Sequence, residues 1–95
     1  MKDQALSAFI ALPLERKIAL LQWIQTNLIP RSTINPLHSS YGIKELVILP
    51  NGMYSYFTND EFKGAMLVAG YKVKDESELN WTFNLSRKSP AFQQR

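Results

Sequence analysis

The sequence predicts a small α+β domain with about three main helices, a short strand and a C-terminal β-hairpin. Three observations lead to this prediction: a capped amphipathic helix over residues 58–70, a second helical stretch after Pro13, and strict alternation over residues 80–86. Ninety-five residues provide for one hydrophobic core, so we expect a single domain over 1–95. The ends, 1–11 and 87–95, are the most weakly specified parts.

The helix over residues 58–70 is the element that the sequence predicts most clearly. Thr58 can cap its first turn, and Glu61 stands three residues later, which is the spacing of a capping box. The residues expected to form its buried face are Phe62, Ala65, Met66 and Ala69. Lys63 is expected to point outward. Gly70 stands where a left-handed turn ends a helix.

Gly64 is unusual in the middle of this helix, because glycine there costs about 1 kcal/mol relative to alanine. Two interpretations account for its missing side chain. One is close packing of another helix, and the other is close approach of a ligand or a nucleic-acid backbone.

The N-terminal part predicts one turn of helix around Leu6, Phe9 and Ile10, and then a helix from Pro13 to about Asn27. The apolar stripe of this second helix comprises Ile18, Leu21, Trp23, Ile24 and Leu28. It is expected to pack in the core or against another helix, and the alternative is a dimer or partner surface.

The middle of the chain predicts an ordered connector over 28–36, since two prolines prevent helix continuation. Residues 42–49 fit a helix best, although 47–49 also fit a short strand. Residues 50–52 predict a turn and 53–57 a short strand.

The C-terminal part alternates over 71–74 and again over 80–86, where Trp81, Phe83 and Leu85 share one side. These two segments could pair as the hairpin of a wing, and Ser89–Pro90 could begin a last helical turn. The element order fits a winged helix with residues 60–69 as the recognition helix, although its charges are mixed.

Composition excludes several classes of function. The chain has no cysteine, which fits a reducing cytoplasm, and it shows no signal peptide or bilayer-spanning run. His38 has no metal-ligating or catalytic companion, and the four glycines are too dispersed to cradle a phosphate. We therefore expect a cytoplasmic protein that is no enzyme, holds no metal or cofactor and contacts no membrane.

The net charge is +3, and the segment 87–95 carries three basic residues and no acidic one. The first hypothesis is therefore a DNA-binding accessory, possibly for single strands, with Tyr54, Tyr56 or Tyr71 stacking on bases. Its candidate phosphate contacts are Lys44, Lys63, Lys72, Lys74, Arg87 and Lys88. The second hypothesis is a protein-binding inhibitor or adaptor. Its candidate contacts are Trp23, the 45–49 segment, Asp75, Glu76 and Glu78.

Four segments of the sequence, taken together, resemble a known family: Trp23–Pro30, Ser39–Lys44, Thr58–Met66 and Asn80–Asn84. From about Leu12 to Pro90, the chain resembles small accessory proteins carried by phages, chromosome cassettes and other mobile elements of Gram-positive bacteria.

The resemblance implies a winged-helix-like core and a cytoplasmic partner of element-encoded replication proteins. The alternative that it implies is an inhibitor of host defence nucleases that occludes a nucleic-acid site. It supplies no catalytic residue, and the chain departs from the family pattern after Lys44.

Overall fold

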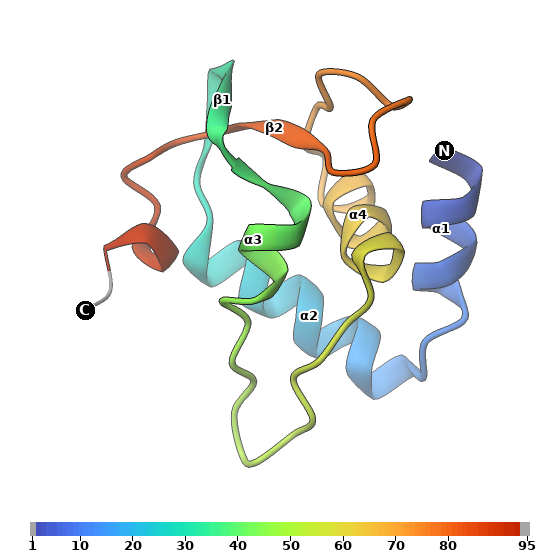
Figure 1. Ribbon diagram of the computed structural model, residues 1–95. Coiled ribbons are helices and arrows are strands. Elements are labelled where there is room, and N and C mark those ends of the chain that lie inside the picture. Colours follow the sequence, from blue (N-terminus) through green and yellow to red (C-terminus); the bar gives the residue numbers. More distant parts are fainter. Residues whose placement is uncertain (1, 94–95) are drawn as a thin grey trace.

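The computed structural model describes residues 2–93 and has seven elements in this range (Figure 1). In chain order they are α1 (Lys2–Ile10), α2 (Leu14–Asn27), β1 (Pro30–Ser39), α3 (Ser40–Lys44), α4 (Asn59–Val68), β2 (Thr82–Leu85) and the 3-10 helix η1 (Pro90–Phe92). The predicted α+β class is confirmed. Arg95, which was counted in the basic tail, lies outside the described residues.

Helix α4 lies at the centre and begins with the predicted capping box. The Thr58 hydroxyl accepts from the Glu61 amide at 3.1 Å, and the Glu61 carboxylate accepts from the Thr58 amide at 2.8 Å. Phe62, Ala65 and Met66 are fully buried, as predicted. The prediction that Ala69 is also buried is wrong, because α4 ends at Val68 and leaves the following turn exposed.

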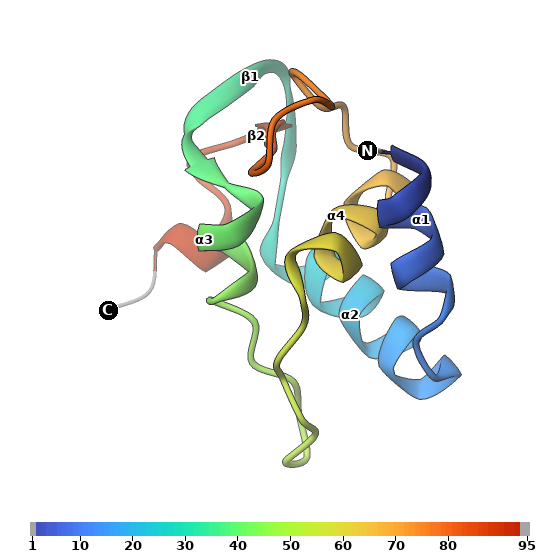
Figure 2. The same ribbon diagram turned by 45° about the vertical axis from the view of Figure 1, so that its right-hand side comes forward.

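Gly64 marks the closest approach between α1 and α4, which lie side by side in Figures 1 and 2. A Cβ atom at this position would lie against the Ala5 carbonyl oxygen and 2.6 Å from the Phe9 Cβ atom. Close helix packing is therefore the reason for this glycine. The prediction of a single turn near residues 6–10 was too short, since α1 begins at Lys2.

Helix α2 covers the other side of the core and ends at Asn27, as predicted. Its buried side chains are Ala19, Leu20, Trp23 and Ile24. Ile18, which the apolar stripe placed inward, is instead about half exposed. The buried face is therefore rotated slightly from the predicted one.

Strand β2 has the predicted alternation, with Phe83 and Leu85 buried, but its main partner was not predicted. It pairs antiparallel with β1, which the sequence analysis interpreted as a connector. The prolines are tolerated because the register shifts between the paired positions, so the ladder is irregular. The expected hairpin of 71–74 with 81–86 is reduced to one bridge between Val73 and Phe83.

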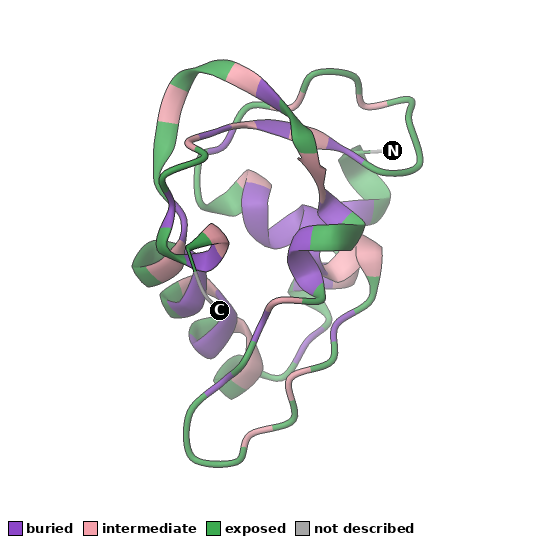
Figure 3. Cartoon of the chain, turned by 60° about the vertical axis from the view of Figure 1, so that its left-hand side comes forward, coloured by how far each residue is buried: buried purple, intermediate pink, exposed green. Residues whose placement is uncertain are grey.

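The segment between α3 and α4 forms a long loop, largely exposed at the lower end of Figure 3. The helical interpretation of 42–49 holds only to Lys44, and 47–49 form no strand. The predicted turn is confirmed, since Asn51 and Gly52 both have positive φ, at 60° and 71°. The predicted strand at 53–57 is wrong, because these residues find no pairing strand.

Candidate nucleic-acid and partner surfaces

Two of the six basic side chains that were predicted to contact phosphate are buried against aromatic rings. Lys44 is 5% exposed, and its ammonium lies 4.5 Å from the Tyr41 ring centre and 2.7 Å from the Glu45 carboxylate. Lys63 is 3% exposed, and its ammonium lies 4.6 Å from the centre of a Trp81 ring. The expectation that Lys63 points outward is therefore wrong, and neither lysine can reach a phosphate.

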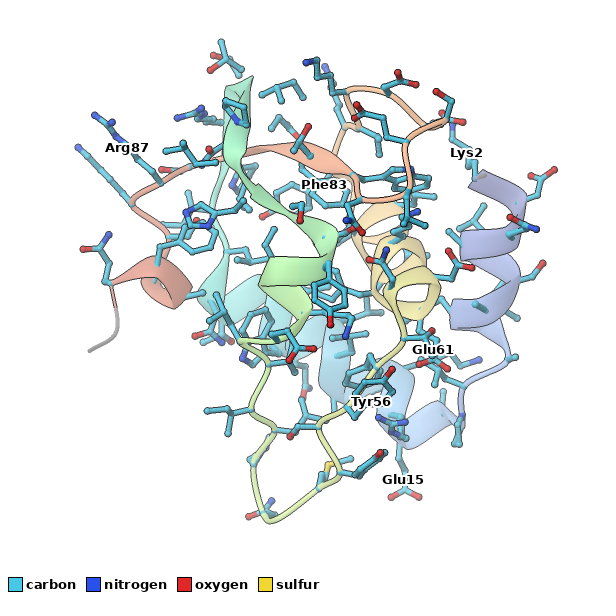
Figure 4. All side chains as sticks on the ribbon, in the orientation of Figure 1. Lys2, Glu15, Tyr56, Glu61, Phe83 and Arg87 are labelled. Carbon is cyan, nitrogen blue, oxygen red and sulfur yellow. The ribbon has the colours of Figure 1, made fainter. Side chains whose placement is uncertain are left out.

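The remaining predicted cations, which we call the ribbon cations, are all exposed: Lys72, Lys74, Arg87 and Lys88. None of the four forms an ion pair within residues 2–93. In Figure 4 the Arg87 side chain extends away from the molecule beyond the end of β2. Their charges are therefore available to solvent and to an anionic ligand.

The Asn84 side chain on β2 hydrogen-bonds to the backbones of Lys72 and Arg31, and we call β2 together with these two flanking segments the ribbon. The side-chain oxygen of Asn84 accepts from the Lys72 amide at 2.7 Å, and its side-chain nitrogen donates to the Arg31 carbonyl at 3.0 Å. Lys74 lies one step further along, with its amide 3.0 Å from the Thr82 carbonyl. Arg31 is not among the contacts predicted from the sequence, because no local pattern predicts that residues 30–39 pair with β2.

Arg87 and Lys88 stand on a tight turn at the other end of β2. Buried Ser89 fixes this turn, since its hydroxyl donates to the Ser86 carbonyl at 2.6 Å and accepts from the Ile29 amide at 2.8 Å. In Figure 1 this turn and the loop after Val73 lie at opposite ends of β2. Arg87 and Lys88 therefore follow one end of β2, Lys74 lies beside Thr82 at its other end, and Lys72 lies beside Asn84 between them.

The acidic loop 75–78 is an ordered turn next to Lys74. The Asp75 carboxylate accepts from the Ser77 hydroxyl at 2.6 Å and from the Ser77 amide at 2.9 Å. These two hydrogen bonds, with a smaller contribution from Lys74, hold the pKa of Asp75 below its ordinary value. Glu76 is tied to α1 by an ion pair with Lys2 at 3.2 Å, while Glu78 is exposed.

Two aromatic candidates lie in the core. Trp23 is 8% exposed and packs in the core, so only a small part of its ring is open to a partner. Tyr71 is buried edge-to-face against Phe83, and burial raises the pKa of its hydroxyl. Tyr71 therefore cannot stack on a base. The rings of Phe92 and His38 are stacked with their centres 3.8 Å apart, so His38 has a packing contact in the structure.

A third group of aromatic residues lies at the surface, and we call it the tyrosine surface: Tyr41, Tyr54 and Tyr56. Their exposed fractions are 54%, 69% and 53%. Lys44 joins Tyr41 to Tyr56, with its ammonium 4.8 Å from the latter ring centre, and the Tyr54 and Tyr56 rings lie 6.3 Å apart. The three rings thus form one connected surface, although two different segments supply them.

An apolar groove lies between α2 and the end of α4, with a volume of about 440 Å³. Leu21, Ile24 and Leu28 form one wall, and Val68 and Tyr71 belong to the other. In the described range no three His, Asp or Glu side chains are placed to hold a metal ion. None of the helices within residues 2–93 has the length and apolar character needed to span a bilayer.

Comparison with family models, with curated proteins and with solved structures found no match to this chain in any of the three.

Proposed function

We propose that the protein is a non-enzymatic nucleic-acid-binding accessory that contacts phosphates through the ribbon cations and Arg31. The observation that carries this proposal is the position of Asn84, which joins the segments of Lys72 and Arg31 to β2. Cations from three separate parts of the chain thereby border one ribbon. In this proposal the core is winged-helix-like, with the loop after Val73 and β2 in the place of the wing.

The binding we propose is weak and tolerant of sequence. Each neutralised phosphate releases condensed counterions, so the affinity depends on the number of free cations and falls with salt. The ribbon cations are exposed and without ion pairs in the described residues, which leaves them free for this role. The carboxylate of Asp75 lies next to Lys74 along the chain and repels phosphate at that end of the ribbon.

The biological setting that we propose follows from the resemblance described above. A cytoplasmic accessory of a phage or another mobile element would bind DNA near an element-encoded replication protein. The alternative is an inhibitor that occludes the nucleic-acid site of a host nuclease. The tyrosine surface favours a protein contact of some kind, because exposed tyrosines are enriched at the centres of protein interfaces.

The test measures fluorescence anisotropy of labelled oligo-dT and of a labelled duplex over a range of salt concentrations. Replacing all four ribbon cations with glutamine should weaken binding about tenfold or more and flatten the salt dependence. Denaturant unfolding should change little, because exposed charges contribute little stability. Equal binding of the wild type and this variant at low salt would contradict the proposal, as would no binding by either.

A matched pair of single variants locates the contact. Lys72→Gln removes one charge beside β2, and Lys17→Gln removes one charge from α2, where it donates to the Ile10 carbonyl. Lys72→Gln should reduce the slope of log affinity against log salt by about one, while Lys17→Gln should leave it unchanged. Equal effects of the two variants would show that net charge alone, and not the ribbon, determines binding.

A further inference from the structure

The side of α2 that faces away from the core carries exposed apolar side chains, which we call the apolar ridge: Ile10, Leu14 and Ile18. Their exposed fractions are 63%, 67% and 47%. Leu14 and Ile18 stand one helical turn apart on α2. The Ile10 carbonyl accepts from the Lys17 ammonium at 3.0 Å, so the end of α1 lies beside the beginning of α2, as Figure 2 also shows.

The same side of α2 continues into the apolar groove between α2 and the end of α4. Leu21 and Gln25 follow Ile18 at the spacing of one helix face, and both line the groove. Val68, which is exposed, lines it from the end of α4. The volume of about 440 Å³ is that of a pocket that encloses a small molecule, so apolar side chains can enter it. One face therefore has a ridge near the beginning of α2 and a hollow near its end.

The two ends of this face have different charged neighbours along the chain. Beside the ridge, Glu15 is exposed and forms no ion pair within residues 2–93, while Lys17 is bonded to a carbonyl of its own chain. At the groove, no lysine, arginine, aspartate or glutamate is among the lining residues, and Arg31 and Lys72 each directly follow one of them. Pairing the ridge end of one copy with the groove end of another therefore brings Glu15 toward the basic end.

We infer that this face is a site for a second copy of the chain, in a two-fold dimer with antiparallel α2 helices. A two-fold axis across the middle of α2 places the ridge of each copy against the groove of the other, so the face is complementary to itself. The ridge-to-groove contact then forms twice, which a partner with only one of these features cannot achieve. The side chains of this face are not the ribbon cations, so variants test the dimer separately from the nucleic-acid proposal.

Sedimentation velocity at increasing protein concentration measures the oligomeric state. The wild type should form dimers in equilibrium with monomers at concentrations up to about 1 mM. Leu14→Glu/Ile18→Glu should raise the dissociation constant about tenfold or more, because carboxylates would enter an apolar groove without partners. The matched control, Leu37→Glu/Leu79→Glu, makes the same charge change at two exposed side chains elsewhere and should dimerise like the wild type.

Single cysteines report the orientation of the helices, because the chain has no cysteine of its own. Gln22 lies near the middle of α2, and Glu15 lies near its beginning on the same side of the helix. Across a central two-fold axis, the two copies of position 22 lie close together and the two copies of position 15 lie far apart. Gln22→Cys should therefore form disulfide-linked dimers under air oxidation, and Glu15→Cys should not.

A third measurement uses the unmodified protein, so that it does not depend on how the variants fold. Raising the protein concentration should shift the backbone amide resonances of residues 14–28 and 68–71 in NMR spectra, and not those of residues 82–88. A wild type that stays monomeric at about 1 mM would overturn the inference and leave this face to a different partner. So would equal dissociation constants of the two glutamate variants, or equal disulfide yields from the two cysteine variants.

Discussion

Lys63 on α4 and Lys74 beside β2 illustrate two different uses of the same side chain. The ammonium of Lys63 is buried over Trp81 and lies 3.9 Å from the Asp60 carboxylate. Lys74 is exposed and has no ion pair in the described part of the chain. The first lysine belongs to the packing of the helices, and the second is free to meet a ligand.

Helices α4 and α3 also differ in how much space surrounds the backbone. At Gly64 the backbone of α1 touches α4 so closely that no Cβ atom fits, whereas no other part of the structure comes within 4 Å of a Cβ atom placed at Gly42 on α3. The residue type alone therefore does not determine the role of a residue. The role depends on which segment packs against that residue. In this protein the α1–α4 pair carries stability, and the ribbon and the tyrosine surface are left open.

The largest effect that separates these regions is expected from the two helical glycines. Gly64→Ala should destabilise the protein by roughly 1–3 kcal/mol, because the new methyl group collides with the Ala5 carbonyl and with Phe9. Gly42→Ala should instead stabilise it by up to about 1 kcal/mol, since the site is open and helical. Urea unfolding measures both, and a stabilising Gly64→Ala would disprove the close packing of α1.

The capped helix and the alternating strand could be predicted because their signals are local. The Thr58–Glu61 spacing determines where α4 begins, and Phe83 and Leu85 alternate with the less buried polar residues Thr82 and Asn84. Gly64 favours close helix packing from the sequence alone, although the sequence predicts only one turn of the helix α1 that packs against it. The expectation of about three main helices was close, since the described residues form four α-helices, of which α3 spans only five residues.

The missed features depend on contacts between distant parts of the chain. The sequence around Pro30 and Pro36 does not predict a strand. Residues 30–39 form β1 only through their irregular pairing with β2. Residues 53–57 have the composition of a strand, but no strand pairs with them. The Arg16 guanidinium donates hydrogen bonds to their Tyr54 and Tyr56 carbonyls instead. A local pattern cannot reveal either relationship.

The candidate site residues also divide into those that local sequence properties indicate and those that depend on distant contacts. Charge alone selects Lys72, Lys74, Arg87 and Lys88 as candidates, and the structure shows that all four are exposed. Lys44 was chosen wrongly, because its burial depends on Tyr56, which lies on a separate segment. The sequence predicts Tyr54 and Tyr56 as candidate stacking residues, but their support by α2 depends on Arg16, which is distant in the sequence.

An intermediate effect is expected from the two contrasting lysines. Lys63→Gln should destabilise the protein by about 1–2 kcal/mol, since the cation–π contact with Trp81 is lost and a polar group stays buried. Lys74→Gln should change the free energy of unfolding by less than about 0.5 kcal/mol. Denaturant unfolding of both variants checks the contrast, and equal small changes would remove Lys63 from the packed core.

The smallest effect concerns Asp75, whose pKa is lowered in the folded protein chiefly by the Ser77 hydroxyl. A lowered pKa means that the folded state binds fewer protons than the unfolded state around the unfolded pKa of 3.8. The contribution of Asp75 to stability is therefore fully present above that value and is lost as the pH falls through the folded pKa. Because the carboxylate is exposed, the change should be small.

Asp75→Asn keeps an acceptor for the Ser77 hydrogen bonds but cannot ionise, so it should remove this part of the pH dependence. Urea unfolding at about pH 6 and about pH 2.5 measures the difference between the variant and the wild type. Glu78→Gln, which removes another carboxylate from the same loop, controls for the change in net charge. If both variants reduce the pH dependence equally, the Ser77 hydrogen bonds are not its cause, and the acidic loop acts only through its overall charge.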